Sequence, residues 1–218
     1  MEMLYYGTTD FKVSEFRHRS VMDEIRMVIT AFECVIPDNT GLYCSSDVTT
    51  GRRLYGVFRK YGVHSVGELE AKLGESQRSE VIEKVIRGNI ERGIEFTENI
   101  RQRGLINLIN PGPFTARGFE QEHYYYLWES VVIKKVCEMW LNEGWEYSNG
   151  CTLEYAIAAR KGIPRRDHLG NILELPQAIH MAEQAIAELR RDGMDIVILE
   201  RNLARMRELR LSYTASLS

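Results

Sequence analysis

The chain has 218 residues, with 28 basic and 31 acidic side chains and 44% hydrophobic residues. This length suits one domain with an appendage or a large insertion, and the composition is that of a globular rather than a disordered protein. The formal charge of −3 lacks the basic excess typical of proteins that hold a phosphate backbone. We therefore expect no duplex nucleic acid as a partner.

Cysteine and histidine spacing excludes the common metal sites. The four cysteines form no CxxC pair, and the five histidines show no ligand spacing, so neither a metal site nor a disulfide framework is expected. No stretch reaches the roughly 18 apolar residues of a membrane span, and the first residues lack the pattern of a signal peptide. The sequence predicts a cytoplasmic protein without a membrane partner.

The first 80 residues carry mixed signals. Residues 21–32 show an amphipathic pattern, and a second helical pattern follows His64. Between them, residues 37–51 are dense in Asn, Asp, Ser, Thr and Gly, which favour turns, so they predict a loop between helices. We expect residues 1–80 to form a separate, mainly helical segment.

From residue 79 helices and strands alternate. Isoleucines recur every four residues from 82 to 94, and Gly104 closes the run, which predicts a long amphipathic helix. Apolar runs at 105–110 and 136–141 predict buried strands. The remaining patterns predict helices at 124–135, 151–161, 175–189 and 196–206. This alternation indicates an α/β domain with parallel strands over residues 81–218 and a helical C-terminus.

The loop after the second strand has the composition of an anion site. In an open parallel sheet, ligands bind beyond the carboxyl ends of the strands. Ser148, Asn149 and Gly150 stand there at the entrance of a helix, where a hydroxyl and free N–H groups favour a phosphate. Plain N-capping by Ser148 or Asn149 explains the same residues.

Glu154 follows in the first turns of that helix. The positive end of the helix dipole stabilises an ionised carboxylate there. Such a carboxylate can attack an anomeric carbon and form a glycosyl ester that water or another acceptor opens. The alternative is a helix-start glutamate that the dipole stabilises and that has no chemical role.

The stretches INLINPGPF and YYLWESVVIKKVCEMWLNEGWEYSNGCTLEYAIAARKGIP resemble the nucleoside 2-deoxyribosyltransferase superfamily, which includes deoxyribosyltransferases and nucleotide N-glycosidases. The resemblance covers roughly residues 84–192 and is most specific over Gly144–Pro164. It implies a Rossmann-like doubly wound fold, Glu154 as the nucleophile, no cofactor, and a homodimer or larger homo-oligomer.

The residue six positions before the nucleophile indicates the substrate class. Members that act on free nucleosides tend to carry Asp there, whereas nucleotide-hydrolysing members resemble this chain, which has Ser148. An aspartate would repel a 5′-phosphate that Ser148, Asn149 and Gly150 would bind. The resemblance thus implies a nucleoside 5′-monophosphate, cleaved or transferred at its N-glycosidic bond.

Other candidate residues carry weaker signals. Glu129 stands 25 residues before Glu154, near the place of a family Asp that assists the base or sugar. It is the expected general acid, with a solvated helix-face glutamate as the alternative. Trp128 and Trp145 are candidates for stacking on the base, although core packing also explains them.

The strand expected at 105–110 ends in further candidates. Asn110 and Gly112 border the base in this interpretation, although the Asn-Pro-Gly-Pro run is also a good turn.

Two departures from the family pattern leave alternatives open. Residues 68–82 contain no strand before the long helix; if Met3–Phe11 forms the first strand instead, Gly7 would lie beside the sugar or phosphate. Cys137 stands where the family carries an Asp.

Two other functions remain as alternatives. One is an NAD glycohydrolase that uses the same carboxylate, and the other is a nucleotide-binding module without activity.

Overall fold

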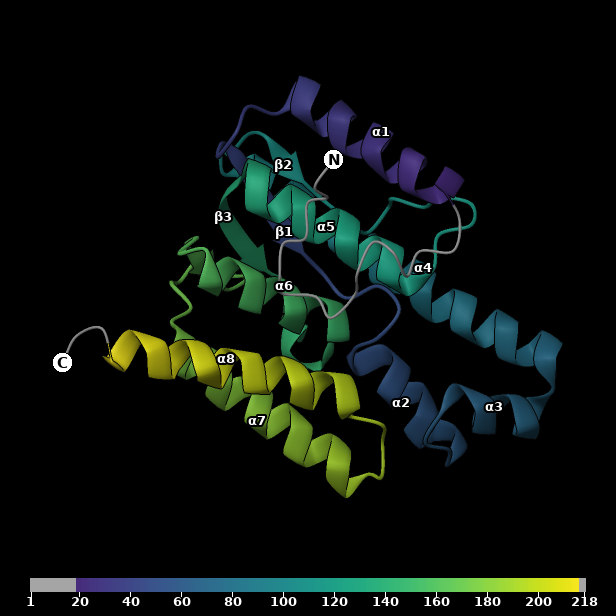
Figure 1. Ribbon diagram of the computed structural model, residues 1–218. Helices are drawn as coiled ribbons and strands as arrows, with labels where there is room; N and C mark the ends of the chain where they lie inside the picture. The colour runs from purple at the N-terminus through teal and green to yellow at the C-terminus, as the bar shows by residue number, and fades with distance from the viewer. Residues whose placement is uncertain (1–18, 216–218) are drawn as a thin grey trace.

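The computed structural model describes residues 19–215, and a four-stranded parallel sheet lies at their centre (Figure 1). The strands are β1 (Gly41–Ser45), β2 (Leu108–Ile109), β3 (Val136–Leu141) and β4 (Arg165–Arg166). Helices make up most of the described chain: α1 (Arg19–Val35), α2 (Arg52–Tyr61), α3 (Val66–Leu73), α4 (Glu75–Gln102), α5 (Gln121–Lys135), α6 (Asn149–Arg160), α7 (Leu175–Arg191) and α8 (Val197–Ala215). The expected α/β class with parallel strands is confirmed.

The strand order across the sheet is β2-β1-β3-β4. Helices α2 to α4 connect β1 to its neighbour β2, and α5 then carries the chain back past β1 to β3 on the other side. The order therefore reverses between β1 and β3, whose last residues, Ser45 and Leu141, stand side by side. Crevices that bind ligands form at such reversals, outside the carboxyl ends of the strands.

Strand β1 corrects the expectation of a loop over residues 37–51. Leu42, Tyr43 and Cys44 are at most 5% exposed, and β1 pairs with both β2 and β3. The turn-forming residues lie on either side of the strand, and pairing with two neighbours outweighs their local preference. The sheet thus joins the two parts of the chain that the sequence analysis divided near residue 80, and Met3–Phe11 lies outside the described residues.

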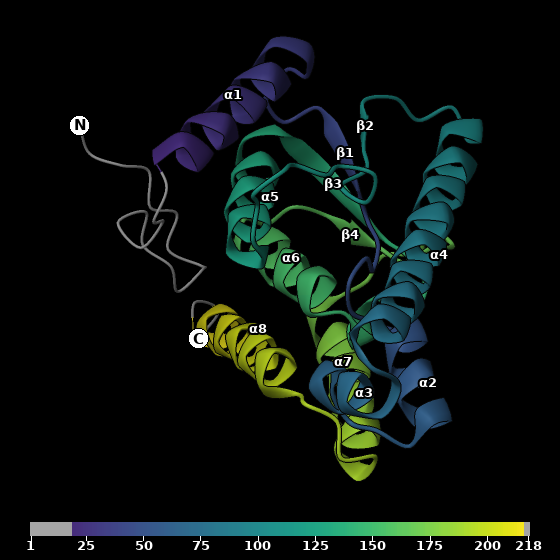
Figure 2. The same cartoon turned by 90° about the vertical axis from the view of Figure 1, so that its right-hand side faces the viewer.

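Side chains of β1 alternate between two layers of helices. Leu42 and Cys44 pack with Phe96 and Ile100 of α4, whereas Tyr43 belongs to the larger core cluster on the other face. Figure 2 shows the same arrangement, with α4 on one side of the strands and α5 and α6 on the other. Because successive residues of a strand point to opposite faces, neighbours in sequence at the end of β1 face different helices.

The long helix α4 is confirmed, but of its isoleucines only Ile82 packs against the main core. Val85, Phe96 and Ile100 are buried, whereas Ile94 is 49% exposed. The hydrophobic periodicity correctly predicted a helix. Two of the residues that it marked, Ile86 and Ile90, line a cavity instead of the core.

The remaining elements differ from expectation by a few residues at their ends. The expected strand at 105–110 shortens to Leu108–Ile109, because Asn107 takes a positive φ of 55° and Ile106 is 76% exposed. Helices α7 and α8 confirm the helical C-terminus; α8 packs on α6, and α7 packs on α8 (Figure 1).

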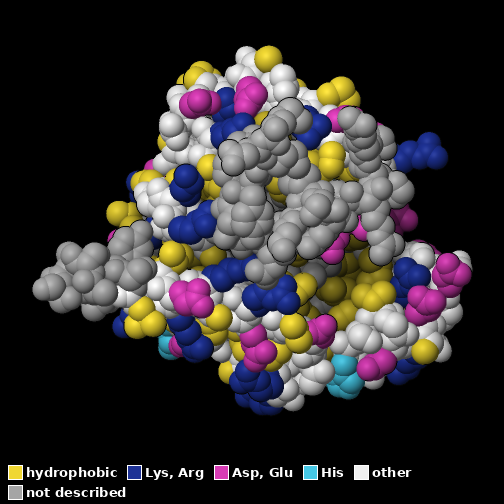
Figure 3. Space-filling view, in the orientation of Figure 1, with side chains coloured by type: hydrophobic (Ala, Val, Ile, Leu, Met, Phe, Trp, Pro, Cys, Tyr) yellow, Lys and Arg dark blue, Asp and Glu magenta, His cyan; other side chains and the backbone are white. Residues whose placement is uncertain are grey.

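The charged side chains on the surface are mixed in sign. Over the visible part of the face in Figure 3, acidic and basic side chains are interspersed, in keeping with the near-balance of charge in the sequence. Within residues 19–215, no helix combines the length and the apolar character needed to cross a membrane.

Candidate active site

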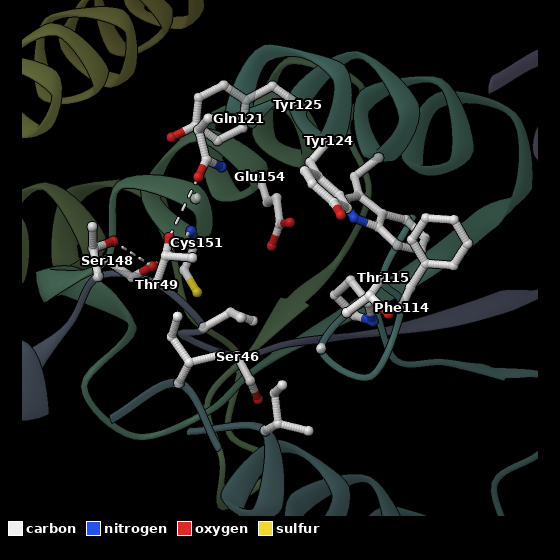
Figure 4. Close-up of a pocket in the computed structure, with 18 of the residues that line it drawn as sticks. Ser46, Thr49, Phe114, Thr115, Gln121, Tyr124, Tyr125, Ser148, Cys151 and Glu154 are labelled. Carbon is white, nitrogen blue, oxygen red and sulfur yellow. Dashed lines mark hydrogen bonds between the residues drawn. The ribbon is translucent and has the colours of Figure 1, made fainter. Parts of the chain in front are cut away.

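A cavity of about 390 Å³ lies beyond the carboxyl end of β1 (Figure 4). It is bounded by the β1–α2 loop, α4, the β2–α5 loop, α5 and the first turns of α6. Ligand pockets measure about 300–1,000 Å³, so this one suits a small ligand. Its lining residues include Ser46, Thr50, Ile86, Ile90, Gly112, Phe114, Trp128, Ser148, Gly150, Cys151 and Glu154.

Glu154 projects from α6 into this cavity, half-buried (Figure 4). The Tyr43 hydroxyl donates to its Oε1 at 2.7 Å, and the Ser45 hydroxyl donates to its Oε2 at 2.6 Å. Burial raises the pKa of Glu154 to about 7, against the lowering effect of these two hydrogen bonds. The carboxyl group is therefore held in one orientation and is close to half ionised at neutral pH.

This environment predicts a pH-dependent effect on stability. An unfolded glutamate has a pKa near 4.5, so between pH 4.5 and 7 the unfolded chain loses this proton before the folded protein does. Stability therefore falls as pH rises through that window. We expect this loss to be absent in Glu154→Gln. The free energy of unfolding of the variant minus that of the parent should therefore be about 2–3 kcal/mol larger at pH 8 than at pH 4.5.

Urea denaturation at the two pH values measures this difference. Glu91→Gln, which changes an exposed carboxylate on α4, is the matched control and is expected to show no such gain. An equal stability difference between Glu154→Gln and the parent at both pH values would contradict the raised pKa.

The first turn of α6 has the expected cap and an additional hydroxyl. Ser148 Oγ accepts a hydrogen bond from the Cys151 N–H at 3.4 Å, which confirms the N-cap, and Ser148 also lines the cavity. Thr50 Oγ1 accepts from the Asn149 N–H at 3.0 Å and lies 3.5 Å from Ser148 Oγ. Of the groups expected at a phosphate, Ser148 and Gly150 thus line the cavity, whereas the Asn149 N–H is already bound to Thr50.

Helix α8 supports this turn from behind. Asn202, only 1% exposed, donates through Nδ2 to the Asn149 carbonyl at 3.0 Å and to Thr152 Oγ1 at 2.9 Å. These bonds tie the first turn of α6 to α8.

One wall of the cavity is aromatic. The Phe114 and Trp128 rings meet edge-to-face with centroids 5.6 Å apart, and Phe119 and Tyr124 pack beside Phe114. All four line the cavity, so Trp128 lies at the site where the sequence analysis expected it. Ile86 and Ile90 of α4 line it as well, so the middle of the isoleucine stripe of α4 faces the cavity.

Two expected site residues lie elsewhere. Trp145 stacks on Tyr155 in the core, with centroids 5.0 Å apart, and is only 3% exposed. Glu129 is 2% exposed, and its carboxylate lies 3.9 Å from the Arg160 guanidinium instead of lining the cavity.

Asn110 and Gly112, the expected site residues of the β2–α5 loop, have different positions. Gly112 lines the cavity, while Asn110 braces the loop by accepting from the Gly112 N–H at 2.9 Å and donating to the Gly93 carbonyl at 3.1 Å. Gly7 lies outside the described residues.

Sequence reasoning missed the hydroxyl residues of β1 and its loop. Tyr43, Ser45, Ser46 and Thr50 all belong to the stretch that its composition marked as a loop. Tyr43 and Glu154 are 111 residues apart, and no local pattern announces a contact at that separation.

Comparisons with family models, with curated proteins and with solved structures find no match to this chain. Among residues 19–215, no three His, Cys, Asp or Glu side chains gather as a metal site would require. The interpretation of the cavity therefore depends on its own geometry and on the motif around Glu154.

Proposed function

We propose that this protein cleaves, or transfers across, the N-glycosidic bond of a nucleoside 5′-monophosphate, with Glu154 as the nucleophile. The observation that carries the proposal is the Glu154 carboxylate, aimed into a cavity of ligand size and held by two hydroxyl donors. The strand order β2-β1-β3-β4 is compatible with the Rossmann-like fold of the deoxyribosyltransferase superfamily that the motif at 144–164 resembles.

The proposed reaction has two steps. The ionised carboxylate attacks the anomeric carbon as the bond to the base breaks, and the glycosyl ester is then opened by water or a second base. The Tyr43 and Ser45 hydroxyls orient the attacking oxygens and stabilise the ionised form. Glu129 has no part in this scheme, because it does not line the cavity.

The α6 end of the cavity supports a phosphate in the proposal. Ser148, Thr50 and the N-terminal backbone of α6 combine hydroxyls with the positive end of a helix dipole. The aromatic wall, together with Ile86 and Ile90 of α4, offers apolar surface for a base. A mononucleotide fits this division, and a volume of about 390 Å³ favours it over NAD, which contains two nucleotides.

The experiment that tests the proposal is incubation with a panel of ribo- and deoxyribonucleoside monophosphates, with release of free base followed by chromatography. The same panel includes NAD and the unphosphorylated nucleosides. Base release from at least one monophosphate is expected. Binding without release would favour a nucleotide-binding module, and release of nicotinamide from NAD alone would favour the glycohydrolase.

The hydrogen bond from Tyr43 to Glu154 should affect the pH dependence of kcat/KM. Since attack requires the ionised carboxylate, kcat/KM is expected to rise with pH through about 7, the pKa of Glu154. Tyr43→Phe removes a hydrogen bond to the ionised form, so the midpoint should move up by about one pH unit and activity at pH 7 should fall about fivefold. The pH profile of kcat/KM measures both effects.

The control for this profile is Tyr61→Phe, a tyrosine on α2 that does not line the cavity. Its profile is expected to match that of the parent. A midpoint unmoved by Tyr43→Phe would mean that the titrating group is not Glu154.

A further inference from the structure

One buried hydroxyl of the cavity has no partner. Ser46 lines the cavity and is 7% exposed, and its Oγ makes no hydrogen bond to any of the described residues. Buried hydroxyls are nearly always bonded, because an unpaired one loses its bonds to water without compensation. By contrast, the hydroxyls of Tyr43, Ser45 and Thr50 are all bonded within the site.

Ser46 and Glu154 occupy opposite sides of the cavity. The side chain of Ser45 turns to Glu154 on α6, and the next residue, Ser46, turns to α4 on the other face of the sheet. There its Cβ and Oγ lie 3.2 Å and 3.4 Å from the point that a Cβ on Gly93 would occupy. Figure 4 shows the two side chains on either side of the open space.

The surroundings of Ser46 leave its hydroxyl without a hydrogen-bond partner among the described residues. Gly93 of α4 provides the space for it, since any larger residue would press on Ser46. Asn110, which would otherwise be a candidate partner, is occupied by Gly93 and Gly112. The neighbouring lining residues on α4, Ile86 and Ile90, offer no hydrogen bond.

A displacement at the anomeric carbon places the departing group opposite the nucleophile. With Glu154 on the α6 side, the base departs toward the α4 side, where Ser46 lies. We propose that the unpaired Ser46 hydroxyl is the hydrogen-bond donor to the leaving base. This inference rests on the proposed function and assigns to Ser46 the leaving-group assistance that sequence reasoning placed on Glu129.

The C1′–N bond breaks and its electron pair passes to the base, while a Glu154 oxygen forms the bond to C1′. Ser46 keeps its proton and donates a hydrogen bond to a carbonyl oxygen or ring nitrogen of the base, where negative charge develops. In hydrolysis, the water that opens the ester supplies hydroxide to C1′ and a proton to the base.

The kinetic test uses Ser46→Ala and monophosphates whose bases differ in leaving ability. Ser46→Ala is expected to lower kcat/KM about 10- to 100-fold, with a larger loss for bases that leave poorly, because these carry more charge in the transition state. Ser130→Ala, which removes an equally buried hydroxyl on α5 outside the cavity, is the matched control and should retain parental kinetics. A loss independent of the base would overturn the proposal.

A binding test separates this inference from the proposed chemistry. Calorimetric titrations of Glu154→Gln, with and without Ser46→Ala, use a nucleoside monophosphate and, as a ligand without a base, 2-deoxyribose 5-phosphate or ribose 5-phosphate. Ser46→Ala should weaken the nucleotide about 3- to 10-fold and leave the sugar phosphate unchanged. Equal weakening of both ligands, no weakening, or no nucleotide binding would each overturn the Ser46 assignment.

The proposed function itself fails if the parent releases no base, and a base-specific loss of binding would still support the Ser46 contact. The thermal midpoint gives an independent check on folding. Removing an unpaired buried hydroxyl should leave the midpoint unchanged or raise it, and a fall of several degrees would show that Ser46 is bonded in the folded protein, which would also contradict the assignment.

Discussion

Glu154→Gln is expected to abolish base release, lowering kcat/KM by about 10³-fold or more, since covalent catalysis does not survive loss of its nucleophile. Glutamine keeps the volume of the side chain; its oxygen can accept from one of the Tyr43 and Ser45 hydroxyls and its NH2 can donate to the oxygen of the other, so the cavity should retain its shape. The measurement is base release under saturating and subsaturating substrate, with nucleotide binding followed by calorimetry.

Two controls make this result specific to the nucleophile. Glu91→Gln makes the same chemical change at an exposed position of α4 and should retain parental activity. Glu154→Gln should still bind the nucleotide, because the groups at the α6 N-terminus remain. Activity of Glu154→Gln within tenfold of the parent would refute the nucleophile assignment.

Ser148→Asp is expected to have the second largest effect and to act on substrate choice. A carboxylate at this position would repel a 5′-phosphate at contact distance, and kcat/KM for the monophosphate should fall by more than about 100-fold. Ser148→Ala should cost about 10- to 150-fold through loss of one charge-assisted hydrogen bond. Both variants should leave any residual cleavage of the unphosphorylated nucleoside nearly unchanged.

The structure adds a condition to this comparison, because Ser148 also caps α6. An N-cap Ser→Ala change costs about 1 kcal/mol of stability, whereas aspartate is itself a good N-cap. Thermal unfolding of both variants therefore accompanies the kinetics. If Ser148→Asp is as stable as the parent and handles the monophosphate equally well, the phosphate lies elsewhere.

The sequence predicted the region from α4 to α8 largely correctly. The long helix α4, the strand β3 and the helix α6 follow from hydrophobic period and capping residues, which are local properties. Glu154 and Ser148 were identifiable for the same reason, since both belong to the first two turns of a helix whose start the sequence marks. For these residues, position in the chain already fixes position in the fold.

Tertiary structure alone decided the other half of the site. Strand β1 is five residues long among turn formers, and it is a strand because β2 and β3 supply its hydrogen bonds from both sides. The contact between Tyr43 and Glu154, and the positions of Ser46 opposite Glu154 and of Glu129 beside Arg160, depend on how the helices pack on that sheet. Sequence thus determined the helices and the carboxylate, because their signals repeat within a few residues; the partners of that carboxylate come from segments more than 100 residues away, which only the folded sheet brings together.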